Sequence, residues 1–141
     1  MPLSEFEMIA KYFRDVFPRR TDTVLGIGDD AALINLPDGY ETSTVILQWQ
    51  PEHDYLPSEP SSHVAHRMLS KAIDDLHIRA AKPAWMTLSL TFQQLDEPWL
   101  SGFSQGLMEL ASKHSIELIG GDTSHGPETL RMCLIGTIKT A

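Results

Sequence analysis

A strictly alternating segment near the middle of the chain limits the possible folds more than any other feature. Residues 84–92 read AWMTLSLTF, and every second position carries a large aliphatic or aromatic side chain. One set consists of Trp85, Thr87, Ser89 and Thr91, and the other of Met86, Leu88, Leu90 and Phe92. A period of two puts the sets on opposite faces, so this segment predicts a half-buried strand. Such a strand needs neighbours in a sheet and a second layer over its apolar face.

Two segments with helical periodicity can supply that second layer. Residues 61–81 and 97–114 each carry apolar residues spaced three or four apart. The two stripes consist of Val64, Met68, Leu69, Ala72, Ile73 and Leu76, and of Leu100, Phe103, Leu107 and Leu110. A third amphipathic segment, residues 4–17, begins with Ser4 and Glu7 at capping-box spacing. Each segment therefore predicts an amphipathic helix.

The remaining apolar segments predict further strands. They are residues 31–36, 42–50, 116–119 and 129–139, with a turn at 37–40 and a loop at GGDTSHGP, residues 120–127. No repeat and no internal linker interrupts this pattern. The sequence therefore predicts one α+β domain, a mixed β-sheet with helices packed on one face.

Charge and composition exclude several classes of function. The formal net charge of -8 argues against sequence-independent binding to nucleic acid and against binding to anionic membranes. A phosphorylated small ligand remains compatible if a cation lies between it and the protein. The single cysteine, Cys133, excludes an intrachain disulfide, and no apolar run approaches the ~20 residues of a membrane span. These observations predict a soluble cytoplasmic protein.

Three acidic sites stand out by their context. GIGDD places Asp29 and Asp30 after a glycine turn, GGDT places Asp122 after Gly121, and AIDDL places Asp75 in a predicted helix beside an apolar face. Mg²⁺ prefers hard oxygen ligands and commonly bridges carboxylates to substrate phosphates, which glycine lets the backbone approach. The alternative is that the loop aspartates make Asx turns and that the helical one is solvated. The residues alone are consistent with both interpretations.

Other familiar catalytic patterns are absent from the sequence. It contains no Gly-x-x-x-x-Gly-Lys-Ser/Thr phosphate loop, and no serine lies in a nucleophile elbow. The six histidines lack the spacing of a metal-binding pair around a shared carboxylate. We therefore assign no catalytic side chain from the sequence.

Five motifs together carry a family resemblance across essentially all 141 residues. They are SEFEMIAKYF, LGIGDDAALI, AKPAWMTLSLTF, DEPWL and LIGGDTSHGP. In these motifs the chain resembles the N-terminal domain of bacterial thiamine-monophosphate kinases, in the superfamily of aminoimidazole ribonucleotide synthetases. The resemblance implies Mg²⁺-dependent transfer of a phosphoryl group from ATP to thiamine monophosphate, giving thiamine diphosphate. It also implies a homodimer formed sheet to sheet, with active sites near the interface.

By position, the resemblance implies roles for individual residues. Asp29, Asp30, Asp75 and Asp122 look like metal ligands, Gly121 and Asp122 would lie against the ATP phosphates, and His53 and Asp54 fall at the substrate contact. No residue is implied as a nucleophile or a general acid or base.

The chain also departs from the family pattern. Val45 to Gln48 replace a Ser-Thr-Asp-Thr metal-binding strand, so that Leu47 takes the place of an aspartate. Asp54 takes the place of a histidine, and Ala72 takes the place of an asparagine. The second domain that completes the family's pocket would begin where this sequence stops. We therefore expect residues 1–141 to be a single N-terminal kinase-like domain without the family's C-terminal domain.

Three hypotheses follow from these observations. The first is the metal- and ATP-binding half of a thiamine-phosphate kinase, with little or no turnover by itself. The second is a catalytically lapsed dimeric module of the same fold, which Leu47 favours because leucine cannot ligate magnesium. The third is an α+β domain whose aspartates have no role in ligand binding.

Overall fold

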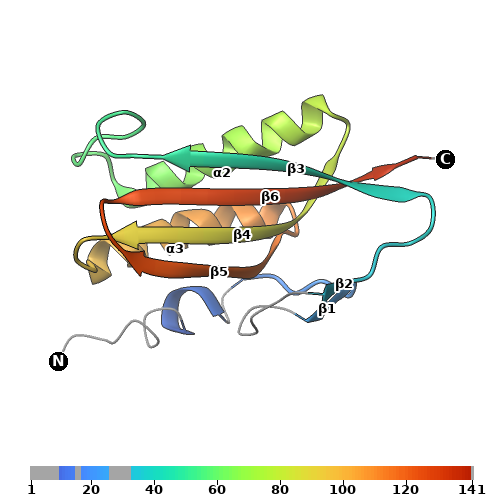
Figure 1. Cartoon of the computed structure of the whole chain (residues 1–141), viewed down its shortest axis with the longest axis horizontal. Helices are drawn as coiled ribbons and strands as arrows, with labels where there is room; N and C mark the ends of the chain where they lie inside the picture. Colours follow the sequence, from blue (N-terminus) through green and yellow to red (C-terminus); the bar gives the residue numbers. More distant parts are fainter. Residues whose placement is uncertain (1–9, 15–16, 26–32, 141) are drawn as a thin grey trace.

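The structure is a computed structural model, and it describes residues 10–14, 17–25 and 33–140. The elements in chain order are η1 (Ala10–Arg14), β1 (Thr23–Leu25), β2 (Leu33–Ile34), β3 (Tyr40–Trp49), α2 (Ser61–Ile78), β4 (Lys82–Phe92), α3 (Glu97–Lys113), β5 (Glu117–His125) and β6 (Thr129–Lys139). Figure 1 shows the four long strands side by side, with β1 and β2 forming a separate small pair next to them.

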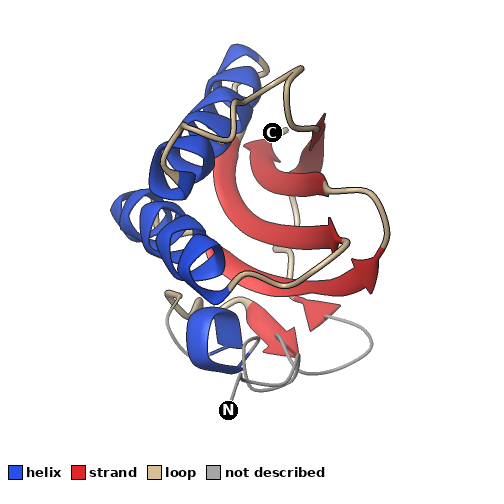
Figure 2. Ribbon diagram, turned by 90° about the vertical axis from the view of Figure 1, so that its left-hand side faces the viewer, coloured by secondary structure: helices blue, strands red, loops and turns tan. Residues whose placement is uncertain are grey.

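The main sheet is mixed and has the strand order β3-β6-β4-β5. β6 pairs antiparallel with both β3 and β4, whereas β4 and β5 are parallel. The parallel pair requires a crossover, which α3 provides. Both helices cover the same face of the sheet, and the main sheet's other face carries no helix in the part of the chain that the structure describes (Figure 2). We call this second face the open face. The predicted α+β class, with helices on one side, is confirmed.

The hydrophobic core lies between the sheet and the two helices. All six apolar residues predicted for the stripe of α2 are buried, as are the four predicted for α3. Met86, Leu88 and Leu90 of β4 face them, while Thr87 and Ser89 lie half-buried on the open face. The two helices approach closely where a side chain on Gly106 would overlap the backbone of Ser62. The alternation in the sequence therefore predicted correctly which face of β4 is covered.

The ends of both helices follow from local chemistry. Asp96 caps α3, because its side chain accepts a hydrogen bond from the Trp99 backbone N–H at 3.2 Å. α2 begins after Pro60 without a side-chain cap and ends at Ile78, three residues before the predicted end. Ala80, just beyond, has a φ of 59°, which a helix cannot contain.

The N-terminal prediction is only partly testable. Of the helix predicted over residues 4–17, the structure describes Ala10–Arg14 and Phe17, and Ala10–Arg14 form a π-helical turn. Phe13 and Phe17 are buried in the main core with their rings stacked at 6.4 Å. Tyr12 joins this segment to α3 through a 2.5 Å hydrogen bond to Glu97.

One predicted loop is wrong. Residues 120–125 of GGDTSHGP continue strand β5 and pair in register with β4 as far as His125. Glycine, aspartate and serine are poor strand formers, but β-propensity depends strongly on context. Here β4, which also pairs with β6 on its other side, supplies backbone partners along the whole length of β5.

None of the described helices is both long and apolar enough to cross a membrane.

Candidate functional site

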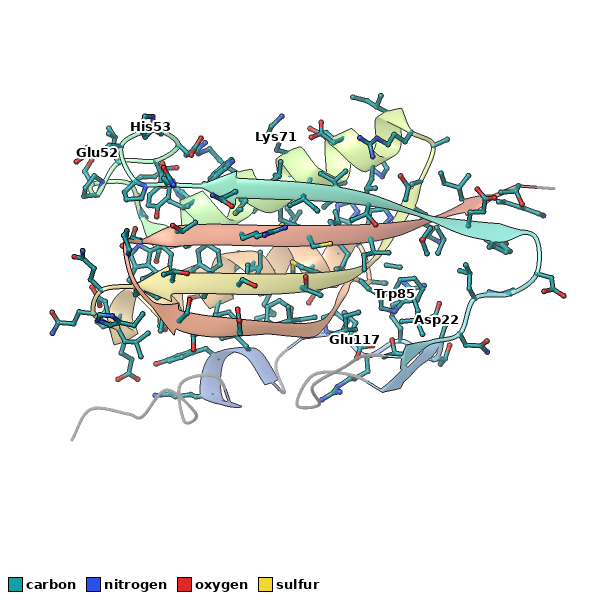
Figure 3. All side chains as sticks on the ribbon, in the orientation of Figure 1. Asp22, Glu52, His53, Lys71, Trp85 and Glu117 are labelled. Carbon is teal, nitrogen blue, oxygen red and sulfur yellow. The ribbon has the colours of Figure 1, made fainter. Side chains whose placement is uncertain are left out.

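The predicted substrate contact lies in the loop between β3 and α2, residues 50–60. His53 is exposed at the tip of this loop, next to Glu52 (Figure 3). Asp54 is half-buried, and its carboxylate accepts a hydrogen bond from the backbone N–H of Gln50 at 2.8 Å. The Asp54 carboxylate therefore closes the turn, whereas the imidazole of His53 faces solvent.

Tyr55 anchors the same loop to the turn between β5 and β6. Its side chain is only 4% exposed, and its hydroxyl donates a 2.5 Å hydrogen bond to the Glu128 carboxylate. Burial, and then this hydrogen bond to an anionic partner, raise the pKa of Tyr55 well above its ordinary value. The phenol therefore stays protonated and keeps donating at neutral pH.

Asp75 lies near the end of α2 and does not point into the core. Its side chain is 35% exposed and pairs with Lys71, one helical turn earlier, at 3.7 Å. The expectation that Asp75 points inward, which its place between the apolar Ala72 and Leu76 in the sequence suggested, is therefore wrong, because the apolar stripe closes through these two residues without it. Asp75 instead lines a shallow groove of about 480 Å³ along α2, together with Trp49, His66, Arg67, Ser70, Lys71 and Asp74.

Gly121 and Asp122 lie on the edge strand β5. Asp122 is exposed and pairs with Ser89 of β4, so its side chain lies on the open face. Gly121 has a φ of 138°, and a side chain there would come within 1.8 Å of the Leu88 carbonyl oxygen. The close approach of β4 is therefore sufficient to require glycine at position 121.

The described acidic residues do not form one cluster within a single chain. α2, which carries Asp75, contacts β3 at one side of the sheet, while Asp122 belongs to β5 at the other edge. Three strand spacings separate these edges, roughly 14 Å, and the two residues lie on opposite faces of the sheet. Within residues 10–14, 17–25 and 33–140, no three His, Cys, Asp or Glu side chains are placed to hold a metal ion. The described part of one chain therefore does not fit a complete magnesium site.

Asp29 and Asp30 lie outside the described residues. The two strands that flank them are described, and they pair antiparallel with Leu25 opposite Leu33. A 2.7 Å hydrogen bond from the Asn35 backbone N–H to the Asp22 carbonyl oxygen extends this pairing. The ends of the segment that contains GIGDD are thus joined by backbone hydrogen bonds.

Leu47, which takes the place of the family aspartate, lies on the helix-covered side of β3. Val45 and Trp49, two residues away in either direction, are buried at 6% and 8% exposure. Leu47 itself is half-buried and packs against the main core. Its side chain therefore contributes to the core, whereas Ile46 is 54% exposed on the open face.

A buried glutamate that sequence reasoning missed holds the N-terminal segment against the sheet. Glu117 is 2% exposed, and its carboxylate accepts hydrogen bonds from the Arg20 backbone N–H at 2.7 Å and from the Thr23 hydroxyl at 2.8 Å. The Thr23 oxygen in turn accepts a 3.0 Å hydrogen bond from the Trp85 indole N–H. The signal available in the sequence was a lone acid within the apolar strand IELI.

Arg20 completes this attachment. Its guanidinium group forms two hydrogen bonds to the Asp22 carboxylate, at 2.9 and 3.0 Å, and lies 5.2 Å from the centre of the Trp85 ring. The hydrogen bond from Arg20 lowers the pKa of Asp22. Figure 3 shows Asp22, Trp85 and Glu117 grouped at one end of the sheet, far from Glu52 and His53 at the other end.

Comparison with known proteins places this architecture in a family. Residues 28–138 match the family described as AIR synthase related protein, N-terminal domain. Two similar curated relatives are thiamine-monophosphate kinases, from Salmonella typhimurium at 38% identity and from Escherichia coli K12 at 37%. In each case the alignment covers 98% of this chain but 42% of the relative. The chain therefore spans less than half the length of these relatives.

Solved structures agree with this assignment. The crystal structure of the thiamine-monophosphate kinase from Stenotrophomonas maltophilia has a TM-score of 0.79 at 32% identity, covering 85% of this chain and 38% of that one. A structure of AaThiL complexed with AMPPCP and TMP has a TM-score of 0.62 at 20% identity, covering 71% and 32%, and supports the fold alone. This chain therefore belongs to the AIR synthase related protein family, as an N-terminal domain that is similar to that of thiamine-monophosphate kinases.

Proposed function

We propose that this chain forms the N-terminal half of an ATP-dependent thiamine-phosphate kinase and acts in the cytoplasm. The observation that carries the proposal is the 38% identity to a thiamine-monophosphate kinase over nearly the whole chain. The reaction would move the γ-phosphoryl group of ATP to the phosphate of thiamine monophosphate, giving thiamine diphosphate. Such a transfer depends mainly on in-line positioning and neutralisation of charge, so it needs no covalent intermediate.

The proposed cation is Mg²⁺, with ligands drawn from Asp29, Asp30, Asp75 and Asp122. Bound Mg²⁺ would neutralise the phosphate oxygens and orient them. Support comes from the chemistry of the donors, which are hard carboxylate oxygens. Asp122 is exposed on its strand, and Asp75 pairs at the surface with Lys71, which a cation could replace. Gly121 and Asp122 would contact the nucleotide, and His53 and Asp54 would contact thiamine monophosphate.

A homodimer is part of the proposal. The open face presents Ile46 at 54% exposure, with Cys133 and Ile135 half-buried beside it. An apolar sheet face of this kind favours a partner. Because Asp75 and Asp122 lie on different faces and edges of one sheet, residues of a second copy would also help to complete the set of ligands.

A catalytically lapsed module is the second candidate, and one observation favours it. Leu47 packs against the core at the position that the resemblance assigns to an aspartate, so the strand contributes apolar contacts in place of a metal ligand. In this alternative the domain would retain the fold and the dimer without turnover.

Calorimetric titration of a non-hydrolysable ATP analogue into the purified chain tests the proposal. We expect binding in magnesium and loss of binding in EDTA, because the acidic protein repels a free nucleotide. Asp122→Asn should weaken the magnesium-dependent affinity at least tenfold. Asp38→Asn, which changes an exposed turn aspartate, is the matched control and should leave it unchanged.

Two results would argue against the proposal. Equal affinity in EDTA and in magnesium would mean that the acidic residues do not bind an ion. Magnesium-dependent binding without any phosphoryl transfer, even when a C-terminal domain of the family is supplied, would favour the lapsed module.

A further inference from the structure

Arg67, in the first half of α2, contacts the loop that carries His53 at two places and also contacts the end of β3, which leads into that loop. Its guanidinium group forms two hydrogen bonds to the Glu59 carboxylate, from Nε at 2.7 Å and from a terminal nitrogen at 2.8 Å. The same terminal nitrogen donates to the Asp54 carbonyl oxygen at 2.8 Å. The group also lies 4.8 Å from the centre of the Trp49 ring, at the end of β3. One side chain thus joins the end of β3 to the middle and the end of the loop.

The turn held in this way is closed by its own hydrogen bonds. The Asp54 backbone N–H donates to the Gln50 carbonyl oxygen at 3.0 Å, and the Glu52 N–H donates to the Tyr55 carbonyl oxygen at 2.6 Å. Glu52 has a φ of 74°, a conformation that residues other than glycine rarely adopt. Such a conformation persists only when its surroundings fix it, and it is often found at functional sites.

The loop is fixed from two sides. On the α2 side the Arg67 contacts hold Asp54 and Glu59, and on the sheet side the Tyr55 hydroxyl is bonded to Glu128. His53 lies between these two attachments and forms no hydrogen bond or ion pair with the described residues. Its imidazole is therefore free to meet a ligand, on a backbone that is already ordered.

Two of the residues in these contacts, Trp49 and Arg67, also line the groove along α2. Trp49 and Arg67 form one end of that groove, and Lys71 and Asp75 lie further along it. A ligand that contacts His53 and enters the groove would pass the guanidinium face of Arg67. The side chain that holds the turn is therefore also part of the lining of the groove.

We propose that Arg67 is a positioning residue that preforms the His53 turn for binding of the phosphorylated substrate. This inference rests on the proposed function, in which the turn contacts thiamine monophosphate. Arginine suits the task because its planar fork can bind a carboxylate through two atoms and still stack on an aromatic ring. Lysine carries the same charge but cannot form this set of contacts at once.

Substitution of Arg67 in the full chain tests this inference. Arg67→Met removes the guanidinium group, and Arg67→Lys keeps only its charge. Glu59→Gln keeps Arg67 but weakens the two hydrogen bonds that Arg67 donates to residue 59. Arg79→Met is the matched control, because Arg79 lies on the cap of the same helix and donates one hydrogen bond to the Thr44 carbonyl oxygen. Two quantities are measured: amide hydrogen exchange at Glu52 and Asp54, and calorimetric affinity for thiamine monophosphate and for magnesium with an ATP analogue.

We expect Arg67→Met to speed amide exchange in the turn at least tenfold and to weaken thiamine monophosphate binding about tenfold. The affinity for the magnesium nucleotide should stay unchanged, which a general loss of structure would not allow. Arg67→Lys and Glu59→Gln should give intermediate effects, and Arg79→Met should give none. Unchanged exchange in Arg67→Met, or equal losses of both affinities, would overturn the inference. Failure of the unchanged chain to bind thiamine monophosphate would instead overturn the proposed function. The exchange data would then test only whether Arg67 orders the turn.

Discussion

Leu47→Asp introduces the acidic residue that the family resemblance implies at this position of β3, and the structure predicts its effect on stability. Leu47 lies in the row of Val45 and Trp49 that faces the helices and packs on the core. Full burial of a leucine side chain contributes about 1.5–3 kcal/mol, so losing this half-buried one costs about 1–2 kcal/mol. Partial desolvation of the new carboxylate adds about 1–2 kcal/mol, for a total of roughly 2–4 kcal/mol.

Gln48→Asp is the matched control for this change. Gln48 is the next residue on the same strand, is exposed on the open face, and receives the same charge without loss of apolar burial. The cost there should stay below about 1 kcal/mol, the span of strand propensity. Thermal melting measures both variants, and we expect Leu47→Asp to melt roughly 8–16 °C below the unchanged chain. Equal melting temperatures for the two variants would refute the assignment of Leu47 to the core side.

Magnesium and nucleotide then distinguish the two functional hypotheses. If the new carboxylate joins an ion site, saturating magnesium with an ATP analogue should stabilise Leu47→Asp more than the unchanged chain. A ligand at about 100 times its dissociation constant contributes about 2.7 kcal/mol, enough to offset most of the loss. A lower melting temperature without any added ligand effect would favour the lapsed module.

Three further predictions concern the attachment of the N-terminal segment, the dimer and acid stability. Glu117→Ala leaves the Arg20 N–H and the Thr23 hydroxyl without their buried acceptor. Urea unfolding should therefore show a free energy of unfolding lower by about 2–4 kcal/mol, with a smaller decrease for Glu117→Gln. Ile46→Asp places a charge on the open face, so light scattering should show a shift from twice the 15.8 kDa chain mass to a single chain; a monomer before substitution would contradict the proposed dimer. The hydrogen bond from Arg67 lowers the pKa of Glu59 below its ordinary 4.5, so the contacts between Arg67 and the loop are complete above that pH. The protection of the Glu52 and Asp54 amides from exchange, corrected for the slower intrinsic exchange in acid, should therefore fall only as the pH drops through the lowered pKa, and unchanged protection down to pH ~2 would refute this.

Local periodicity was enough to predict much of the architecture. In α2, residues spaced three and four apart predicted the buried face, and all six named residues are buried. In β4, alternation separated Leu88 and Leu90 from Thr87 and Ser89 correctly. These patterns depend only on helix and strand geometry, which is the same wherever the element lies in the fold.

Contacts between distant segments decided the rest of the fold. Trp85 belongs by alternation to the open face, yet it is fully buried, because the segment around β1 and β2 covers that end of the sheet. Glu117 lies 32 positions later in the sequence and is buried by the same segment, through Arg20 and Thr23. The sequence pattern of its own strand does not predict this burial. No local pattern indicates that residues 20–23 would reach these two side chains.

The sequence by itself determined the element types, the apolar faces, the acidic residues and the family resemblance, because each of these depends on residue type and spacing. Only the tertiary structure decided that GGDTSH is an edge strand, that Asp75 is a surface residue paired with Lys71, and that Asp122 lies at the far edge of the sheet. It also showed that Arg67 joins the end of β3 to two parts of the His53 loop. The physical reason is that strand order and helix docking are set by long-range backbone pairing and burial, and these determine which side chains meet.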